Sequence, residues 1–221
     1  MATKAKKKNK EEILDIYMEY VLSQGIDVSV EDLCADTKLD KYNLYDYFDS
    51  IPHIERSVWE SLLQASVQTV TQDELFDTLP KRDQLLSFYY TFFENCELNG
   101  DFLTLSIDNH GRWGMVQVLA LMKEVYIEFI NHLDIIGSCG VGTIDDTINK
   151  ISDKISGEGF YGQLLFLIDF WHNDDSQDKE KTDVAIEKAV KATMDLLDVT
   201  PLKSVFDFGK FIFQERFTKK A

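Results

Sequence analysis

The sequence is poor in the residues that build disulfide frameworks and metal sites. Its three cysteines, Cys34, Cys96 and Cys139, are an odd number and none belongs to a CxxC pair, which argues against disulfides and against a zinc site. The four histidines lie far apart and none stands in an HExxH motif. We therefore expect no metal and no cofactor, and we interpret each cysteine as a small apolar core residue.

Proline, glycine and strand-forming patterns are scarce as well. The 221 residues include three prolines and eleven widely spaced glycines, and alternating apolar and polar runs rich in Val, Ile and Thr are few. These absences predict an all-α protein without a sheet. No apolar run approaches about 18 residues and no apolar segment follows the opening MATKAKKKNK, so we expect no transmembrane span, no secretory signal and a cytoplasmic protein.

Motifs that carry catalysis are missing too. The sequence has no GxSxG elbow, no GxGxxG after a strand and no pair of carboxylates in a recognisable catalytic frame. The glycine-rich GSCGVG at 137–142 is not a phosphate loop, because no Lys-Ser/Thr pair follows it. We expect that the protein is not an enzyme.

The shortage of basic residues relative to acidic ones is the most informative feature of the composition. Lys and Arg number 23 against 39 Asp and Glu, which gives a formal net charge of −16 and opposes attraction to nucleic-acid phosphates unless basic residues gather in one place. Five lysines do gather in a short arm before the first expected helix: Lys4, Lys6, Lys7, Lys8 and Lys10. One interpretation is that these lysines lie against a DNA backbone or in a minor groove. An equally supported interpretation is that they form a solubilising tail.

Residues 10–71 carry the start and stop signals of four helices. The first has a single apolar stripe and ends at Gly25. Ser29 can cap a second helix of about two turns, Asp40 a third, and Ser50 a long fourth helix that tolerates Pro52 in its first turn and runs into the low seventies.

The third helix is short and aromatic. We expect Leu44, Tyr45 and Phe48 to turn inward. The residues expected to lie at least partly outward, where they would meet a ligand, are Lys41, Tyr42, Asn43, Asp46 and Tyr47.

These segments resemble the helix-turn-helix of TetR-family transcriptional regulators over about residues 10–62. The resemblance rests on Asp32-Leu33-Cys34, Leu39-Asp40-Lys41, Leu44-Tyr45, Tyr47-Phe48 and Ser50. It implies a DNA-binding domain at 1–50, whose third helix enters the major groove, and a helical ligand-binding and dimerisation domain at 51–221. The implied DNA-contacting residues are Lys4, Lys6, Lys7, Lys8, Lys10, Ser29, Lys38, Lys41, Tyr42, Asn43, Tyr45 and Tyr47.

The chain departs from the family pattern in ways that affect DNA binding. Lys38 occupies the turn where the family usually carries glycine, so a left-handed backbone there would cost about 1 kcal/mol. Ile51 stands where the family has a phosphate-binding lysine, and Asp46 and Asp49 add negative charge. Between residues 11 and 50, eleven acidic residues face two basic ones, a balance of −9, and the five arm lysines bring it to −4. We expect weak, salt-sensitive DNA binding that depends on the arm.

From about Thr71 the sequence predicts a helical bundle rich in aromatic residues. We expect a helix broken at Gly111 and Gly114, a long helix over 115–136, and a polar helix over 144–155 that ends at the GEG glycines. For any single aromatic residue a core role is favoured over a pocket. Candidate ligand-binding residues are Phe88, Tyr89, Phe92, Phe93, His110, Trp113, Met122, Tyr126 and Phe129.

The resemblance also implies that the last two core helices pair with those of a second subunit. The segments concerned are 160–173 and 178–197, and the resulting homodimer would hold two recognition helices about one DNA turn apart. A further aromatic helix is expected over 201–217. Candidate dimer residues are Phe160, Leu164, Leu167, Ile168, Trp171, Ile186, Val190, Thr193 and Leu197.

Two functions from different classes remain open. The first is a transcriptional regulator that binds double-stranded operator DNA and responds to a small, mostly apolar or aromatic effector, which shifts the fourth helix and changes the spacing of the recognition helices. The alternative is a helical binding protein for a lipid-like or aromatic molecule that keeps the fold but has little or no DNA binding. The retained apolar pattern favours the first, and the negative charge favours the second.

Overall fold

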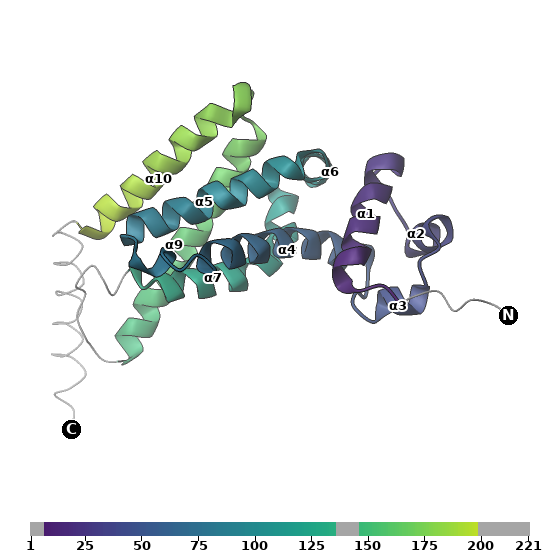
Figure 1. Cartoon of the computed structure of the whole chain (residues 1–221), viewed down its shortest axis with the longest axis horizontal. Coiled ribbons are helices and arrows are strands. Elements are labelled where there is room, and N and C mark those ends of the chain that lie inside the picture. The colour runs from purple at the N-terminus through teal and green to yellow at the C-terminus, as the bar shows by residue number, and fades with distance from the viewer. Residues whose placement is uncertain (1–6, 136–145, 199–221) are drawn as a thin grey trace. The chain divides into compact units, whose positions relative to one another are not determined.

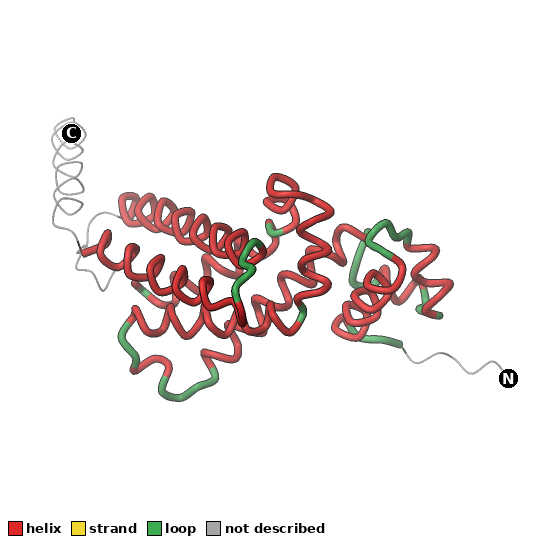
Figure 2. The backbone as a smooth tube through the Cα atoms, turned by 90° about the horizontal axis from the view of Figure 1, so that it is seen from above, coloured by secondary structure: helices red, strands yellow, loops and turns green. Residues whose placement is uncertain are grey.

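The computed structural model describes the backbone of residues 7–135 and 146–198, and within these ranges the side chains of 112–113, 146–156 and 196–198 are not described. All regular structure in the described part is helical, without a strand (Figure 2). The expected all-α class is therefore confirmed. Within these same ranges, no helix is both long and apolar enough to cross a membrane.

Nine α-helices and two short 3-10 helices make up the described part of the chain (Figure 1). Their bounds are α1 Lys10–Gln24, α2 Val30–Thr37, α3 Lys41–Tyr45, α4 Ile51–Thr71, η1 Phe76–Thr78, α5 Lys81–Leu98, α6 Gly100–Val118, α7 Ala120–Leu133, α9 Asp146–His172, η2 Gln177–Lys179 and α10 Glu180–Asp198. The expected loop at 137–142, the helix over 201–217 and the arm lysines Lys4 and Lys6 lie outside the described residues.

The chain divides into two compact units. The first comprises Met1–Asp73 with Thr91–Tyr126, and the second comprises Glu74–Tyr90 with Ile127–Ala221. In the first unit α1 packs on α2, α4 and α6, and α4 also packs on α6. The helix-turn-helix therefore shares one compact unit with two helices from the larger expected domain, while the functional boundary at residue 50 stays a prediction.

Helix α1 is fixed at both ends by local signals. Asn9 and Glu12 form a reciprocal capping box at its start, and Gly25 ends it with φ of 94°. Its buried stripe includes Ile13 and Tyr17, both with no exposed surface. The Tyr17 ring packs edge-on against Phe102 of α6 with centroids 5.8 Å apart, which joins α1 to the first unit's core.

The α2–turn–α3 segment follows the expected capping pattern. The Ser29 hydroxyl accepts a hydrogen bond from the Asp32 N–H at 3.1 Å, and an Asp40 carboxylate oxygen accepts one from the Tyr42 N–H at 3.0 Å. Lys38 ends α2 in the left-handed conformation, with φ of 57° and ψ of 26°. The left-handed turn expected from the family pattern is therefore present, with lysine in place of glycine.

Two expected helix breaks differ from the structure. Gly111 does kink α6, with φ of 62° and ψ of 174°, but Gly114 lies within α6, which continues to Val118. Helix α9 runs through Gly157 and Gly159 instead of ending there. Gly157 is buried, and a β-carbon on it would lie 3.3 Å from the Ile127 side chain, so this glycine permits close packing and does not stop the helix.

Helices α9 and α10 pack along each other in the second unit (Figure 1). Their buried residues include Leu164, Trp171 and Ile186. Gln163 of α9 links two neighbours, because its Oε1 accepts a hydrogen bond from the Tyr89 hydroxyl at 2.9 Å and its Nε2 donates to Thr193 Oγ1 at 2.8 Å.

Candidate nucleic-acid interface

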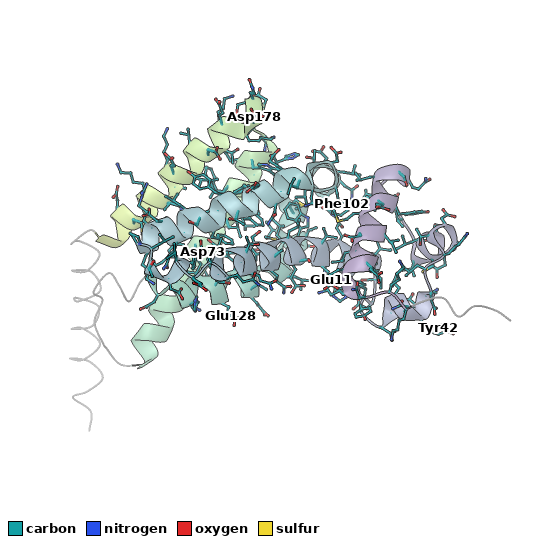
Figure 3. The ribbon with its side chains drawn as sticks, viewed as in Figure 1. Glu11, Tyr42, Asp73, Phe102, Glu128 and Asp178 are labelled. Carbon is teal, nitrogen blue, oxygen red and sulfur yellow. The ribbon has the colours of Figure 1, made fainter. Side chains whose placement is uncertain are left out.

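Three tyrosines form the exposed face of α3 and of the residues that follow it. Tyr42 is 85% exposed (Figure 3), Tyr45 46% and Tyr47 39%. Leu44 and Phe48 anchor the segment in the core with at most 1% of their surface exposed. Phenol hydroxyls presented in this way can hydrogen-bond to phosphates or base edges. The expectation that Tyr45 turns inward is wrong, because Leu44 and Phe48, four residues apart, already define the inward face of the segment.

Asn43 was expected to face outward, and the structure buries it with 4% of its surface exposed. Its Oδ1 accepts a hydrogen bond from the Lys8 N–H at 2.6 Å, and its Nδ2 donates to the Lys8 carbonyl at 3.0 Å. Both ends of the amide are thus engaged by the backbone of the N-terminal arm. The side chain is therefore not presented to a base edge.

The arm lysines that the structure describes lie beside carboxylates. Lys7 Nζ is 2.9 Å from Asp46, Lys10 Nζ 3.6 Å from Glu60 and Lys8 Nζ 3.8 Å from Glu12. The hydrogen bond to Asp46 raises the pKa of Lys7. These ion pairs reduce the positive potential that the lysines would offer to phosphates.

Two further basic residues of the helix-turn-helix differ in their surroundings. Lys41 pairs with Glu31 of α2, and this hydrogen bond raises the pKa of Lys41 and lowers that of Glu31. Lys38 is exposed and has no carboxylate partner among the described residues. Ser29 is occupied as the cap of α2 and donates its own proton to Asp32 at 2.5 Å.

A groove of about 440 Å³ lies between the arm and the α2–α3 turn. It has cations from Lys7, Lys8 and Lys38 on its walls, and it is also lined by Asp40 and Asp46. The mixed charge means that a phosphate here would have to displace Asp46 from Lys7 to gain full attraction.

A buried polar network that the sequence did not predict joins α4 to α6 within the first unit. Glu55 is only 4% exposed, and its carboxylate accepts hydrogen bonds from Ser106 Oγ at 2.7 Å and lies 2.9 Å from His110 Nε2. Trp59 Nε1 donates to the same Ser106 hydroxyl at 3.3 Å. The sequence offered one signal that Glu55 is buried, namely its position four residues before Trp59 on the buried side of α4.

Tyr17 adds to the polar character of this region. Its hydroxyl is buried without a hydrogen-bond partner, and burial, followed by the charge of Glu55, raises its pKa. His110, a predicted ligand-binding residue, is thus engaged with Glu55. Gly111 kinks the helix directly after it, and a β-carbon at Gly114 would lie 2.9 Å from the His110 β-carbon, so the absence of a side chain at Gly114 makes room for His110.

The other predicted ligand-binding residues whose side chains are described are aromatic or apolar core residues with at most 5% of their surface exposed. In the second unit, Phe88 stacks on Phe129 with centroids 4.6 Å apart and contacts Tyr89 at 5.4 Å. The side chain of Trp113 lies outside the described residues. Four of the predicted ligand-binding residues are buried in the first unit: Phe92, Phe93, Met122 and Tyr126.

Of the nine predicted dimer residues, seven are buried within one chain and Thr193 is half-buried. The side chain of Leu197 lies outside the described residues. The exposed apolar surface of the same helices is a groove of about 670 Å³. Phe166 is 55% and Val184 48% exposed there, and Phe170 packs beside Phe166 with centroids 6.1 Å apart. Its lining residues are Phe166, Phe170, Glu180, Lys181, Val184, Ala185, Lys188 and Ala189.

Comparison with known proteins adds to this geometry. Residues 84–212 match the family model described as the C-terminal domain of tetracyclin repressor-like proteins. A Syntrophomonas wolfei structure assigned to the TetR family of transcriptional regulators is similar to this chain with a TM-score of 0.59 at 12% identity, covering 84% of this chain and 94% of that one. The fatty acid degradation regulator FadR of Bacillus halodurans is similar with a TM-score of 0.51 at 11% identity, covering 87% and 99%. No curated protein matches the chain.

Proposed function

The chain belongs to the TetR family of transcriptional regulators, and we propose that it binds operator DNA as a homodimer through α3 and its N-terminal arm, with affinity altered by a small, mostly apolar effector. The observation that carries this proposal is the α2–turn–α3 segment. It has side-chain caps at the starts of both helices, a left-handed turn at Lys38, and three exposed tyrosines in and just after α3.

The electrostatics predict that binding is weak and steeply dependent on salt. The arm lysines and Lys41 start from intramolecular ion pairs, so each contact with a phosphate exchanges one anion for another. If about four lysine–phosphate contacts form, affinity falls roughly 100-fold between about 50 and about 200 mM salt. Tyrosine contacts are uncharged and do not add to this dependence.

An effector response would pass through the contact between α4 and α6. The kink at Gly111 sets the position of His110, and His110 contacts Glu55 on the helix that follows α3. A molecule that alters the course of α6 would therefore alter the support of α4. The aromatic side chains that include Phe88 and Phe129 fit an apolar or aromatic effector better than a charged one.

The homodimer is proposed to form on the exposed groove of α9 and α10, and not through the residues buried in one chain. Phe166, Phe170 and Val184 give this surface an apolar centre, and Ala185 and Ala189 allow a second helix to approach closely. Lys188 and Glu180 stand on the same surface, so a two-fold related copy offers opposite charges to each. Sedimentation should give about twice the 25.5 kDa of one chain, and Phe166→Glu should give monomers while Leu98→Glu, exposed elsewhere, should not.

A second candidate function, small-molecule binding without DNA binding, is favoured by one observation. The described lysines of the arm and Lys41 lie beside acidic side chains, which leaves Lys38 as a free cation of the helix-turn-helix. On this alternative, the fold would serve as a carrier or sensor of a lipid-like or aromatic molecule.

A gel-shift titration distinguishes the two candidates. Purified protein is titrated against pooled, sheared genomic DNA that includes the region around its own gene, at about 50 and about 200 mM salt. The regulator gives a shifted species at the lower salt that weakens sharply at the higher one. Tyr42→Ala should weaken this complex and Leu98→Ala should not. Absence of any shift at the lower salt would refute direct DNA binding and leave the second candidate.

A further inference from the structure

Asn43 is a buried amide side chain in a recognition helix that also carries two exposed tyrosines. It has 4% of its surface exposed, between Tyr42 at 85% and, after Leu44, Tyr45 at 46%. A buried amide is destabilising unless its donor and its acceptor are both satisfied. The partners that satisfy Asn43 therefore indicate what the residue does.

Both partners belong to one residue of the N-terminal arm. The Lys8 N–H donates to Asn43 Oδ1 at 2.6 Å, and the Lys8 carbonyl accepts from Asn43 Nδ2 at 3.0 Å, across 35 positions of sequence. This is the pairing that a neighbouring β-strand would give the arm, supplied here by one side chain. Only an amide offers a donor and an acceptor in this geometry, since aspartate lacks the donor and leucine lacks both.

The residues on either side of Lys8 are also held. Asn9 caps α1, and its N–H donates to Glu12 at 2.9 Å. Lys7 Nζ lies 2.9 Å from Asp46, one residue past the end of α3. The Lys7–Asp46 pair is exposed on both sides and so contributes little by itself, which leaves the two part-buried hydrogen bonds of Asn43 as the main attachment.

We infer that Asn43 is a positioning residue that clamps the arm at Lys8 to α3, so that Lys7, Lys8 and the recognition helix meet DNA as one preorganised element. Asn43 acts on DNA through Lys8 and the arm and does not read a base itself. The effect on DNA binding rests on the proposed function, whereas the attachment of Lys8 to Asn43 is a property of the protein alone. Its benefit is that the backbone at Lys7 and Lys8 is ordered before binding, so less entropy is lost when the complex forms.

The first test needs no DNA. Amide hydrogen exchange at Lys8 is measured by NMR in the full chain and in Asn43→Ala, with Tyr42→Ala as the matched control on the same helix. We expect exchange at Lys8 to become at least about tenfold faster in Asn43→Ala and to stay within about twofold in Tyr42→Ala, since hydrogen-bonded amides are protected. An unchanged rate in Asn43→Ala would overturn the clamp.

Two further variants separate the clamp from general loss of structure. Asn43→Asp keeps the acceptor for the Lys8 N–H and loses the donor to its carbonyl, so its exchange rate should lie between those of the wild type and Asn43→Ala. Asp46→Asn leaves the buried core untouched and releases only Lys7, so it should speed exchange at Lys8 by a few-fold at most. If Asn43→Ala fails to fold, Asn43→Asp decides: a wild-type exchange rate at Lys8 in this variant would overturn the clamp.

The second test asks how Asn43 acts on DNA. Affinity is measured for the wild type, Asn43→Ala, a chain lacking residues 1–8, and the combination. If Asn43 acts through the arm, Asn43→Ala weakens binding several-fold in the full chain and by less than about twofold once the arm is removed. Equal losses in both backgrounds would show base reading and overturn the inference. A wild type that binds no DNA would refute the proposed function, while the exchange rates would still decide the clamp.

Discussion

The buried pair of Glu55 and His110 gives the sharpest stability prediction. We expect His110→Ala to destabilise the protein, because Glu55 is 4% exposed and would keep a buried carboxylate with Ser106 as its remaining side-chain donor in the network. The Trp59 indole bonds the same hydroxyl at 3.3 Å, so the disturbance would reach the core contact between α4 and α6.

The magnitude follows from burial. Leaving a fully buried carboxylate without its hydrogen-bonded partner costs up to about 3–5 kcal/mol. The His110 side chain is 30% exposed and that of Glu55 is 6% exposed, so water can partly replace the imidazole, and we expect about 2 kcal/mol. Glu55→Gln removes the charge and retains an oxygen acceptor for Ser106, so it should cost about 1 kcal/mol.

The assay is urea unfolding of the wild type, both single variants and the double variant, followed by circular dichroism. In the Glu55→Gln background, His110→Ala should cost at least about 1 kcal/mol less than in the wild type, because no buried charge is left unpaired. Gln117→Ala, exposed on the same helix, serves as the control and should change stability by less than about 0.5 kcal/mol. Equal costs of His110→Ala in both backgrounds would refute the reasoning.

Three further predictions concern the backbone, a helix cap and a thiol. Lys38→Gly should stabilise the protein by about 1 kcal/mol in thermal or urea unfolding, because φ of 57° is strained for lysine; destabilisation would contradict this. Burial acts to raise the pKa of Asp174, but hydrogen bonds from Ser176 and Thr182 outweigh it and hold the pKa well below its usual range. Asp174→Ala should therefore cost about 1 kcal/mol at neutral pH. Because the folded-state pKa is lowered, this difference should shrink as pH falls below about 4, the unfolded value, and a constant difference down to strongly acidic pH would contradict the assignment. Burial raises the pKa of the Cys96 thiol well above its ordinary value, so in a Cys139→Ser background a disulfide reagent should label half-buried Cys34 first and Cys96 only on unfolding. Equal rates for the two thiols would count against that burial.

Local signals allowed much of the helix-turn-helix to be predicted. Ser29 and Asp40 each have a capping hydroxyl or carboxylate that acts within three residues, and Gly25 and Lys38 end helices through their own backbone conformations. Such signals are written within a few residues of the element they define. Helix α4 begins at Ile51 with Pro52 in its first turn, as predicted, but the Ser50 side chain does not cap it, because its hydroxyl makes no capping hydrogen bond and donates to Asp49 at 2.9 Å.

The direction in which a side chain points, and contacts between residues far apart in sequence, were harder to predict. Helix α3 has five residues, which is too short for apolar periodicity to fix its inward face, so Asn43 and Tyr45 were placed the wrong way round. Glu55 and His110 are 55 positions apart, and no local rule joins them. On α9, apolar residues occur nearly all round, so the sequence did not separate the side buried in its own chain from the side that exposes Phe166.

The most direct test of the central claim is a photo-crosslink from the recognition helix to DNA. A photoreactive phenylalanine analogue replaces Tyr42, the most exposed of the three tyrosines, and in a second protein replaces Leu98, which is 78% exposed outside the helix-turn-helix. The account predicts a covalent DNA adduct from position 42 at low salt and none from position 98. Irradiation that yields no adduct at position 42, or equal adducts at both positions, would contradict DNA binding through α3.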